Sequence, residues 1–229
     1  MSTPKKLRHA VKDDSFPRID SIKKVVPQWY KNAPTYTEGK KPRFLPQTNL
    51  AIKTCIPFLD TLTTGYYIPL VTDIIVDIEE GNPRLSWGVS TPASQRSTSQ
   101  APTLPIPEGC SPLHFLWILQ TVIELPKGYS ALLTHPLNRF DLPFVTLSGI
   151  VDGGYALGSG SFPFFIKENF EGVIPRGTPI IQVIPFKTES WVSEEDSSLV
   201  SAGDVEARRS MSTAVGWYKH NRWTKKTYD

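Results

Sequence analysis

The residues best suited to chemistry lie in the segment LSGIVDGGY, Leu147–Tyr155. Two glycines follow Asp152 and permit positive φ, so we expect a sharp turn that presents Asp152 and Tyr155 near a hairpin tip. A carboxylate placed there can act as a general base toward a water aligned on phosphorus. In the structural alternative, Asp152 stabilises its own turn and Tyr155 belongs to the core.

Two more polar residues extend this pattern. Arg139 ends the run HPLNR, and a guanidinium can bind phosphate through charge-assisted hydrogen bonds. Gln182, in IPRGTPIIQVI (Ile174–Ile184), can hydrogen-bond a phosphate or a base. Each again has a structural alternative, since Arg139 can pair with Asp141 and Gln182 can cap a strand. The motifs are hypotheses until their structural context is known.

No metal site or other catalytic motif is predicted. The four histidines have no HxxxH spacing, and Cys55 and Cys110 can make neither a disulfide framework nor a four-cysteine zinc site. His135, just before PLNR, can lie at the edge of a site, although a structural role is favoured. Phosphate-binding glycine loops and nucleophile elbows are absent from the sequence.

The C-terminal tail alternates aromatic and basic residues. This pattern can stack on single-stranded nucleic acid, or it can anchor the tail on a neighbouring subunit. We favour the anchor, because Trp, Tyr and Arg are typical of interfaces. The predicted interface residues are Trp217, Tyr218, Trp223 and Tyr228, which alternate with Lys219, Arg222, Lys225 and Lys226.

The composition limits the class of protein. The chain has 229 residues, 39% of them hydrophobic, which suffices for one domain with extensions. Its 21 prolines argue against an all-helical bundle. A net charge of +3 is too weak to imply nucleic-acid binding by itself, so contact through the basic arms is possible but not favoured. The polar N-terminus shows no signal peptide, and the apolar stretch 113–125 is too short for a membrane span, so we expect a soluble protein in a reducing compartment.

Runs of β-branched and aromatic residues, separated by turn signals, predict an all-β fold. Expected strands include two within 65–78, one over 113–125, one over 129–134 and short ones near 144–147, 150–151, 162–166 and 180–185. The Ser, Thr and Pro-rich segment 81–111 is predicted to be a long loop insertion. We therefore divide the chain into an N-terminal arm (1–50, with the basic piece Lys40–Pro46), a β domain (51–188) and a C-terminal arm (189–229), in which 204–211 can open a helix.

Four segments in order resemble the trimeric dUTPase and dCTP-deaminase superfamily, over roughly residues 60–187. LSGIVDGGY is similar to its third motif, IPRGTPIIQVI to its fourth, LPKGYSALLTHPLNR to its second, and GYYIPLVTDIIV more weakly to its first. The resemblance implies a β-clip or distorted jelly-roll barrel that forms homotrimers. It also implies that Asp152 would hold the attacking water, that Tyr155 would stack beneath a deoxyribose, and that Mg²⁺ would arrive with the triphosphate.

The sequence departs from the enzyme pattern at several places. Tyr67 replaces the aspartate of the first motif, and Phe140 and Asp141 follow Arg139 where a small hydroxyl and a glycine are usual. The tail 203–229 holds only Gly203 and Gly216, so the glycine-rich arm that closes over the nucleotide is missing. The glutamate of dCTP deaminases has no counterpart, because Phe162–Phe165 occupies that region.

Through its IPFLD, PLNR and GIVD segments and its aromatic-basic C-terminus, the whole chain also resembles uncharacterised proteins of large tailed bacteriophages. We therefore expect a non-catalytic, self-associating virion structural or assembly component, such as a head-decoration protein, without a cofactor. It would reside in the virion or in the host cytoplasm during infection, with other phage structural proteins as partners. The alternatives are a divergent nucleotide hydrolase that uses Asp152 and Mg²⁺, and a nucleotide-binding protein without chemistry.

Overall fold

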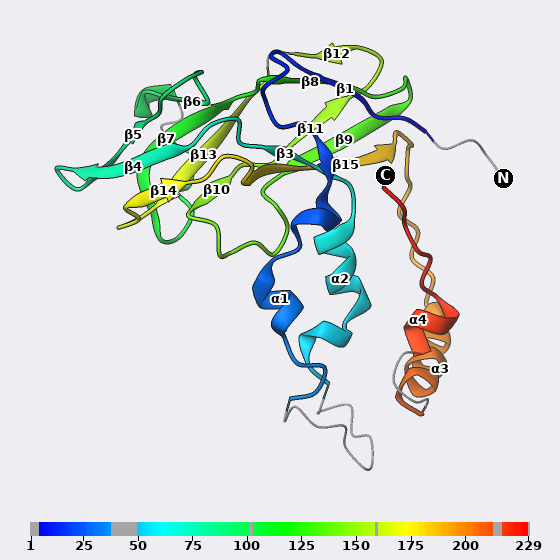
Figure 1. Cartoon of the computed structure of the whole chain (residues 1–229). Coiled ribbons are helices and arrows are strands. Elements are labelled where there is room, and N and C mark those ends of the chain that lie inside the picture. The colour runs from blue at the N-terminus through cyan, green and yellow to red at the C-terminus, as the bar shows by residue number, and fades with distance from the viewer. Residues whose placement is uncertain (1–4, 38–49, 101–102, 159, 213–216, 229) are drawn as a thin grey trace. The chain divides into compact units, whose positions relative to one another are not determined.

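The computed structural model describes residues 5–37, 50–100, 103–158, 160–212 and 217–228 (Figure 1). The chain forms two compact units. The first, here called the β unit, consists of Met1–Val25 and Gly65–Thr188, and the second, the helical unit, consists of Val26–Thr64 and Glu189–Tyr228.

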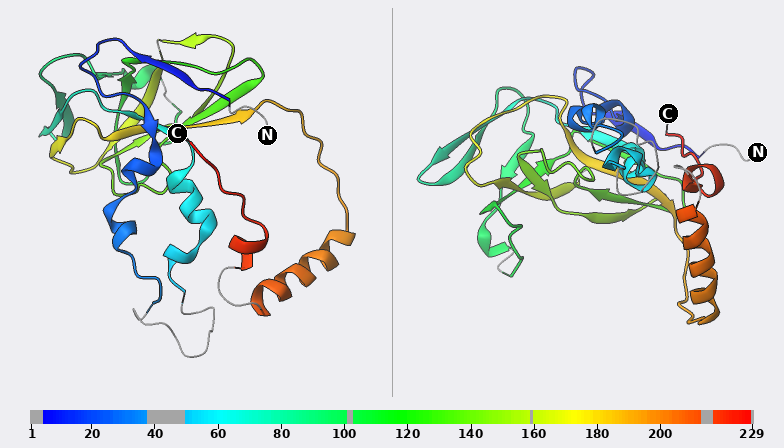
Figure 2. Two further views of the ribbon diagram at one scale, coloured as in Figure 1. Left: turned by 45° about the vertical axis from the view of Figure 1, so that its right-hand side comes forward. Right: turned by 90° about the horizontal axis from the view of Figure 1, so that it is seen from below.

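Strands of the β unit form four antiparallel sheets (Figures 1 and 2). A five-stranded sheet has the order β11-β9-β15-β3-β2, a four-stranded sheet β10-β13-β7-β6, and two three-stranded sheets β1-β8-β12 and β14-β4-β5. Their bounds are β1 (Arg8–Val11), β2 (Asp20–Ser21), β3 (Tyr66–Pro69), β4 (Ile74–Glu79), β5 (Asn82–Ser86), β6 (Ala93–Gln95), β7 (Cys110–Ile118), β8 (Thr121–Glu124), β9 (Tyr129–Thr134), β10 (Phe144–Thr146), β11 (Gly149–Asp152), β12 (Ala156–Leu157), β13 (Ser161–Lys167), β14 (Gly172–Ile174) and β15 (Pro179–Lys187).

The predicted all-β class is confirmed, and the expected strands are present. Segment 113–125 proves to be two strands, β7 and β8, because the chain turns between Ile118 and Thr121. The described strands hydrogen-bond as four separate sheets and close no barrel.

Some expected boundaries differ. Residues 8–11 and 20–21, assigned to the N-terminal arm, are strands that pair with β8 and β3. Segment 81–111, expected as a loop, contains β5 and β6. The start of the β domain near Ile52 is instead helical, with α2 over Ile56–Thr63. Proline is tolerated in the first helical turn, so Pro57 does not oppose this helix.

Aromatic side chains fill the core of the β unit. Trp117 of β7 stacks on Phe164 of β13, with ring centroids 3.5 Å apart and ring planes 5° apart. Phe144 of β10 meets Trp117 edge to face at 5.1 Å. These three rings are fully buried, and each supplies a large apolar area to the core.

One hydroxyl joins the two largest sheets. The indole Nε1 of Trp117 donates to Thr146 Oγ1 at 2.9 Å, and Thr146 Oγ1 donates to the carbonyl oxygen of Ile180 at 2.8 Å. Ile180 lies at an irregularity in the pairing of β15 with β3, between Pro179 and Ile181. A bulge leaves its extra residue outside the regular ladder, and here Thr146 donates a hydrogen bond to the carbonyl of that residue.

The helical unit contains α1 (Gln28–Asn32), α2, α3 (Ser198–Ser212) and α4 (Trp217–Asn221), with 3₁₀ turns over Ile52–Thr54 and, in the β unit, over Ile22–Val25 and Thr98–Gln100. Helices α1 and α2 lie side by side (Figure 2). Tyr30 stacks on Phe58 between them, with centroids 5.8 Å apart. The helix expected over 204–211 is present within the longer α3, and Lys40–Pro46 lies outside the described residues. No helix in the described part of the chain is long and apolar enough to cross a membrane.

The Thr146 bridge yields a stability prediction. Thr146→Val leaves a buried indole N–H and a buried carbonyl without partners, so we expect the free energy of unfolding to fall by roughly 2 to 4 kcal/mol. Thr146→Ser keeps the hydroxyl and loses one methyl group, at a cost of about 1 kcal/mol. Urea denaturation of both variants measures the difference. Equal stability of the two variants would show that the bridge contributes nothing.

Candidate functional site

Asp152 ends β11 and lies opposite Ser130 of β9. The buried Ser130 hydroxyl donates to Asp152 Oδ1 at 2.8 Å. Its oxygen also lies 2.7 Å from Thr188 Oγ1, and because the Ser130 proton is already used, Thr188 is the donor there. Asp152 itself is exposed. Ser130 and Thr188 were not predicted as site residues, since they become neighbours of Asp152 only through the folding of the sheet.

The two glycines after Asp152 are required by the backbone. Gly153 donates its N–H to Tyr129 O at 2.7 Å, and Gly154 donates to Leu125 O at 2.9 Å. A Cβ on Gly153 would lie 2.5 Å from the carbonyl oxygen of Pro126, and Gly154 has a φ of +96°. The predicted turn is therefore held against the entry to β9. Tyr155 beyond it is exposed and does not belong to the core.

Arg139 forms an ion pair with Asp141, two residues further along the chain. Nε donates to Asp141 Oδ1 at 2.9 Å and Nη2 donates to Asp141 Oδ2 at 2.9 Å. Nη1 donates to the carbonyl oxygen of Val25 at 3.2 Å. The Arg139 side chain is only 13% exposed. Binding of a phosphate by Arg139 would therefore require that the phosphate displace Asp141 from a two-pronged ion pair.

Gln182 is fully buried at the centre of β15. It lies between Tyr67 of β3 and Thr134 of β9 in the sheet. Its Oε1 accepts the backbone N–H of Leu137 at 2.8 Å, so the amide fixes the turn that follows β9. Asn138 in that turn has a positive φ of 59°. In this arrangement Gln182 positions the loop that carries Arg139.

The four candidate side chains divide into two groups. Gln182 and Arg139 are joined through the turn after Thr134, at one end of β9. Asp152 and Tyr155 belong to the other end, because Asp152 lies opposite Ser130. Ser130 and Thr134 are four positions apart along β9, which is about 13 Å. Within one chain, the structure does not bring Asp152 together with Arg139 and Gln182.

His135 is held in one tautomer. The backbone N–H of Thr146 donates to Nδ1 at 3.4 Å, so the hydrogen sits on Nε2, which donates to the carbonyl oxygen of Arg139 at 3.1 Å. Burial lowers the pKa of His135 below its usual value, and the positive charges of Lys167 and Arg139 lower it further. This histidine is a neutral structural link between β10 and the Arg139 turn.

A row of apolar side chains lies on the outer face of the five-stranded sheet, and the sequence analysis missed it. Ile150, Leu132 and Ile184 are register neighbours on β11, β9 and β15. Ile150 is 67% exposed, and the exposed Phe186 lies two residues beyond Ile184 on the same face of β15. The opposite face, with Leu133 and Val183, is buried in the core. An available signal was GIVD, which carries adjacent apolar residues on both faces of an edge strand.

The tail residues predicted to form an interface make contacts within the helical unit. Trp223 Nε1 lies 3.1 Å from both carboxylate oxygens of Asp60 in α2. Lys226 pairs with the same carboxylate at 2.5 Å. Arg222 lies over the ring of Trp217 at 5.3 Å, and Tyr218 is exposed. Tyr228 is partly buried. Anchoring on another subunit by these aromatics remains a prediction.

Within the described part of the chain, no group of histidine, cysteine, aspartate or glutamate side chains is placed to hold a metal ion. Cys55 is exposed, Cys110 is buried, and both are free.

Comparison with known proteins identifies similar structures but no sequence family. No protein-family model matches the chain, and no curated protein matches it. Two solved structures to which it is similar are phage dUTPases, the family that the sequence segments resemble. A mutant dUTPase of Staphylococcus bacteriophage 80alpha has a TM-score of 0.37 and 10% identity, and the alignment covers 84% of this chain and 96% of that one.

The second is a mutant dUTPase from phage phi11 of S. aureus, with a TM-score of 0.36 and 12% identity, over 84% of this chain and 97% of that one. That structure is described as coordinating a structural Mg(II) ion. At these identities and TM-scores, the similarity carries nothing about the activity or the partners of this chain.

His135 makes stability depend on pH. The unfolded chain takes up a proton near pH 6.5, whereas folded His135, with its lowered pKa, does not. The contribution of His135 to the free energy of unfolding is therefore present above about pH 6.5. It is lost as pH falls, by at most about 1.4 kcal/mol per pH unit. We expect the free energy of unfolding to fall between about pH 7 and 5. In His135→Gln, which keeps an N–H donor, this fall in the free energy of unfolding should be smaller. Urea titrations of both proteins at several pH values measure it. The same pH dependence in the variant and the wild type would contradict the role of His135.

Proposed function

We propose that this chain is a non-catalytic, self-associating β-fold protein that serves as a phage virion structural or assembly component, such as a head-decoration protein. The main observation behind the proposal is that side chains of the candidate site are already used in hydrogen bonds and ion pairs within the fold. Gln182 is fully buried and binds Leu137, and Arg139 is paired with Asp141. Neither side chain is presented to a ligand.

Phosphate chemistry needs donors aimed at the charge that develops during the reaction. Asp141 places a carboxylate where a phosphate would have to bind, and this negative charge would repel it. The Arg139 turn is further fixed by His135 and Gln182. Opening it would leave a buried amide without its partner, which is costly. The local structure therefore opposes a phosphate at this place.

The outer face of the five-stranded sheet supports self-association. A solvent-facing side of an antiparallel sheet is ordinarily polar, yet on this face Ile150 and Phe186 are exposed and Leu132 and Ile184 are partly exposed. Contiguous exposed apolar side chains are typical of protein interfaces. The exposed Asp152 adjoins these side chains on the same face of β11 and would lie at the rim. We propose a second copy of the chain as the occupant, and a homotrimer as the assembly.

The C-terminal arm has exposed apolar residues that could contact other proteins. Helix α3 exposes Leu199, Val200 and Val205, and Trp191 and Val192 in the preceding segment are also exposed. Long arms with exposed apolar residues can hold neighbouring proteins in an assembly. We propose other phage structural proteins as those partners, and the virion, or the host cytoplasm during assembly, as the location.

One observation favours a second candidate function, a divergent nucleotide hydrolase. Asp152 is exposed at the turn, within a hydrogen-bonded chain of two hydroxyls, and the exposed Tyr155 lies beside it. A carboxylate so placed can still accept a proton from water. Arg139 and Gln182 of the same chain lie at the other end of β9, so a neighbouring subunit would have to supply the phosphate-binding groups.

Sedimentation velocity tests self-association. We expect the full chain to sediment as an oligomer at micromolar concentration, and Ile150→Lys to sediment as a monomer, because burying an unpaired ammonium in an interface is costly. Lys at this position lies beside Asp152, so the monomer itself should remain folded. The control is Val173→Lys, which places the same charge on an exposed apolar position of β14 and should leave the oligomer intact. A monomeric wild-type chain would exclude the proposal.

A further inference from the structure

Helix α3 is the longest helix in the described part of the chain, and its surface is almost entirely uncovered (orange in Figure 2). Every residue from 198 to 209 is exposed except the half-buried Glu206. Leu199 is 63% exposed and Val205 48% exposed, although both are apolar. An isolated helix of this length is marginal in water, and most helices in proteins are stabilised by packing of an apolar face. The exposed apolar side chains of α3 therefore suit a packing partner.

A groove of about 620 Å³ runs along one face of α3. Leu199, Ala202, Gly203 and Glu206 lie in its wall, and their spacing of three, four and seven residues places them on the same face of the helix. Arg222, just after α4, lies on the far side, and its Nε is 2.7 Å from Glu206 Oε1. This ion pair occupies the charged groups at that point, while the apolar positions of the groove stay open.

The middle of the groove is lined by the smallest side chains. Ala202 and Gly203 lie there, and a Cβ added to Gly203 would meet no atom within 4 Å. The distance between two packed helices depends on the side chains at their contact, so small residues permit a close approach. The groove can therefore accept an element as wide as a second helix.

The charge changes sign along this part of the chain. Glu194, Glu195 and Asp196 precede α3, and Asp196 Oδ1 accepts the N–H of Ser198 at 2.9 Å in its first turn. Arg208 and Arg209 lie toward the other end of the helix. A second α3 in the antiparallel direction would bring its basic end to this acidic end, whereas a parallel copy would oppose like charges. The helix dipoles also favour the antiparallel direction.

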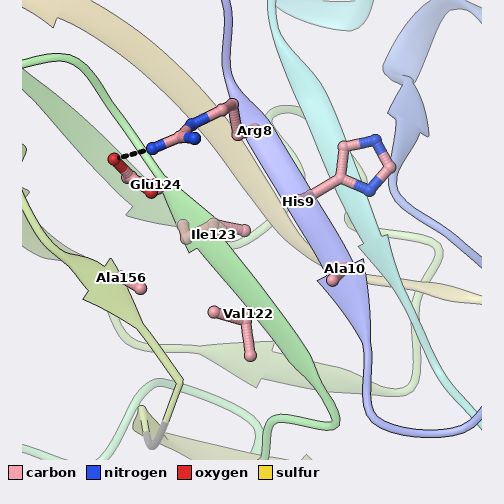
Figure 3. Close-up of a pocket in the computed structure, with 7 residues that line it drawn as sticks. All are labelled: Arg8, His9, Ala10, Val122, Ile123, Glu124 and Ala156. Atoms are coloured by element: carbon pink, nitrogen blue, oxygen red, sulfur yellow. Dashed lines mark hydrogen bonds and ion pairs between the residues drawn. The ribbon is translucent and has the colours of Figure 1, made fainter.

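The hollow over β1, β8 and β12 has no such complementarity. It has a volume of about 170 Å³ (Figure 3). Figure 3 shows Arg8 reaching across to Glu124, with which it forms an ion pair. The charges of this pair are used within the β unit, and they offer no pattern that selects a partner.

We propose that α3 pairs with α3 of a second copy of the chain, in the antiparallel direction and about a two-fold axis at Ala202. In this register Leu199 packs against the partner's Val205, and Ala202 contacts the partner's Ala202. Arg209 then faces the partner's Glu195. The contact is isologous, since both copies use the same surface. Trp191 and Val192 of the preceding segment stay available to the other partners proposed above.

A single helix pair is a small interface. It buries less than the roughly 1,200 Å² at which specific interfaces become stable, so separate chains pair only transiently. At micromolar concentration Ile150→Lys should therefore still sediment as a monomer. In an oligomer held by the outer face of the five-stranded sheet, several α3 helices act together, and their pairing links one oligomer to the next. This linkage rests on the proposed self-association, whereas the pairing of α3 does not.

Disulfide capture in the full chain tests the pairing. The exposed, free Cys55 is first changed to Ser so that it cannot react. Ala202→Cys then places two thiols at the two-fold axis, and the control Ser201→Cys places them one residue away, outside the groove. A disulfide requires Cα atoms within about 7 Å. Under mild oxidation, Ala202→Cys should form a covalent dimer about tenfold faster than Ser201→Cys, because pairing raises the effective concentration of the partner thiol.

Equal rates for the two cysteine variants, or no dimer in either, would overturn the proposal. Because the covalent dimer is read on a denaturing gel, the result does not depend on the contact through the five-stranded sheet. We expect the same dimer when Ile150→Lys is added, and its loss there would contradict α3 as a separate contact. A monomeric wild-type chain in sedimentation would exclude the proposed self-association and leave this test unaffected.

Charge reversal tests the direction of the pairing. Arg208→Glu together with Arg209→Glu should slow the capture of Ala202→Cys, because carboxylates of the two copies would then face one another. These changes also weaken the helix, since basic residues near its C-terminus stabilise it. Adding Glu194→Lys and Glu195→Lys restores the complementarity without repairing the helix end, so the rate of capture should recover. No recovery would contradict the antiparallel arrangement.

Discussion

The two largest sheets of the β unit depend on one buried hydroxyl. Thr146 stands between the indole of Trp117 and the carbonyl of Ile180, and it satisfies both groups where apolar rings surround them. Ile180 lies at the irregular pairing of β15 with β3, and its carbonyl accepts the Thr146 hydroxyl there. Polar atoms in this core are retained because the backbone requires them.

The same requirement explains the state of the candidate site. Gln182 lies two residues beyond Ile180, and its amide completes the turn after β9 as Thr146 completes the bulge. His135 links that turn to the backbone of Thr146, and Arg139 closes on Asp141. Side chains of the types that bind nucleotides are present, but they stabilise the loop that carries them. The outer face of β11, β9 and β15, in contrast, carries apolar side chains that stay exposed, among them Ile150 and Phe186.

The sequence predicted the parts of this structure that depend on local pattern. Alternation and turn residues located most strands, and Asp152-Gly153-Gly154 located the turn, because a glycine requirement is visible in one segment. Contacts between distant segments could not be predicted. Residues 8–11 have no strong strand signal and become a strand by pairing with β8. The expected start of the β domain is instead the helix α2, whose Pro57 lies in its first turn. The pairing of Arg139 with Asp141 was one of two open alternatives, and only the structure distinguishes them.

Under the proposed function, the polar side chains of the candidate site stabilise the fold and perform no chemistry. The most direct test is a turnover assay of the purified chain with dUTP, dCTP and the other common nucleotides in the presence of Mg²⁺, with pyrophosphate, phosphate and ammonia as the measured products. We expect no release above background, and the same result for Asp152→Asn. Turnover by the wild-type chain that Asp152→Asn abolishes would contradict the account and would establish Asp152 as a catalytic base.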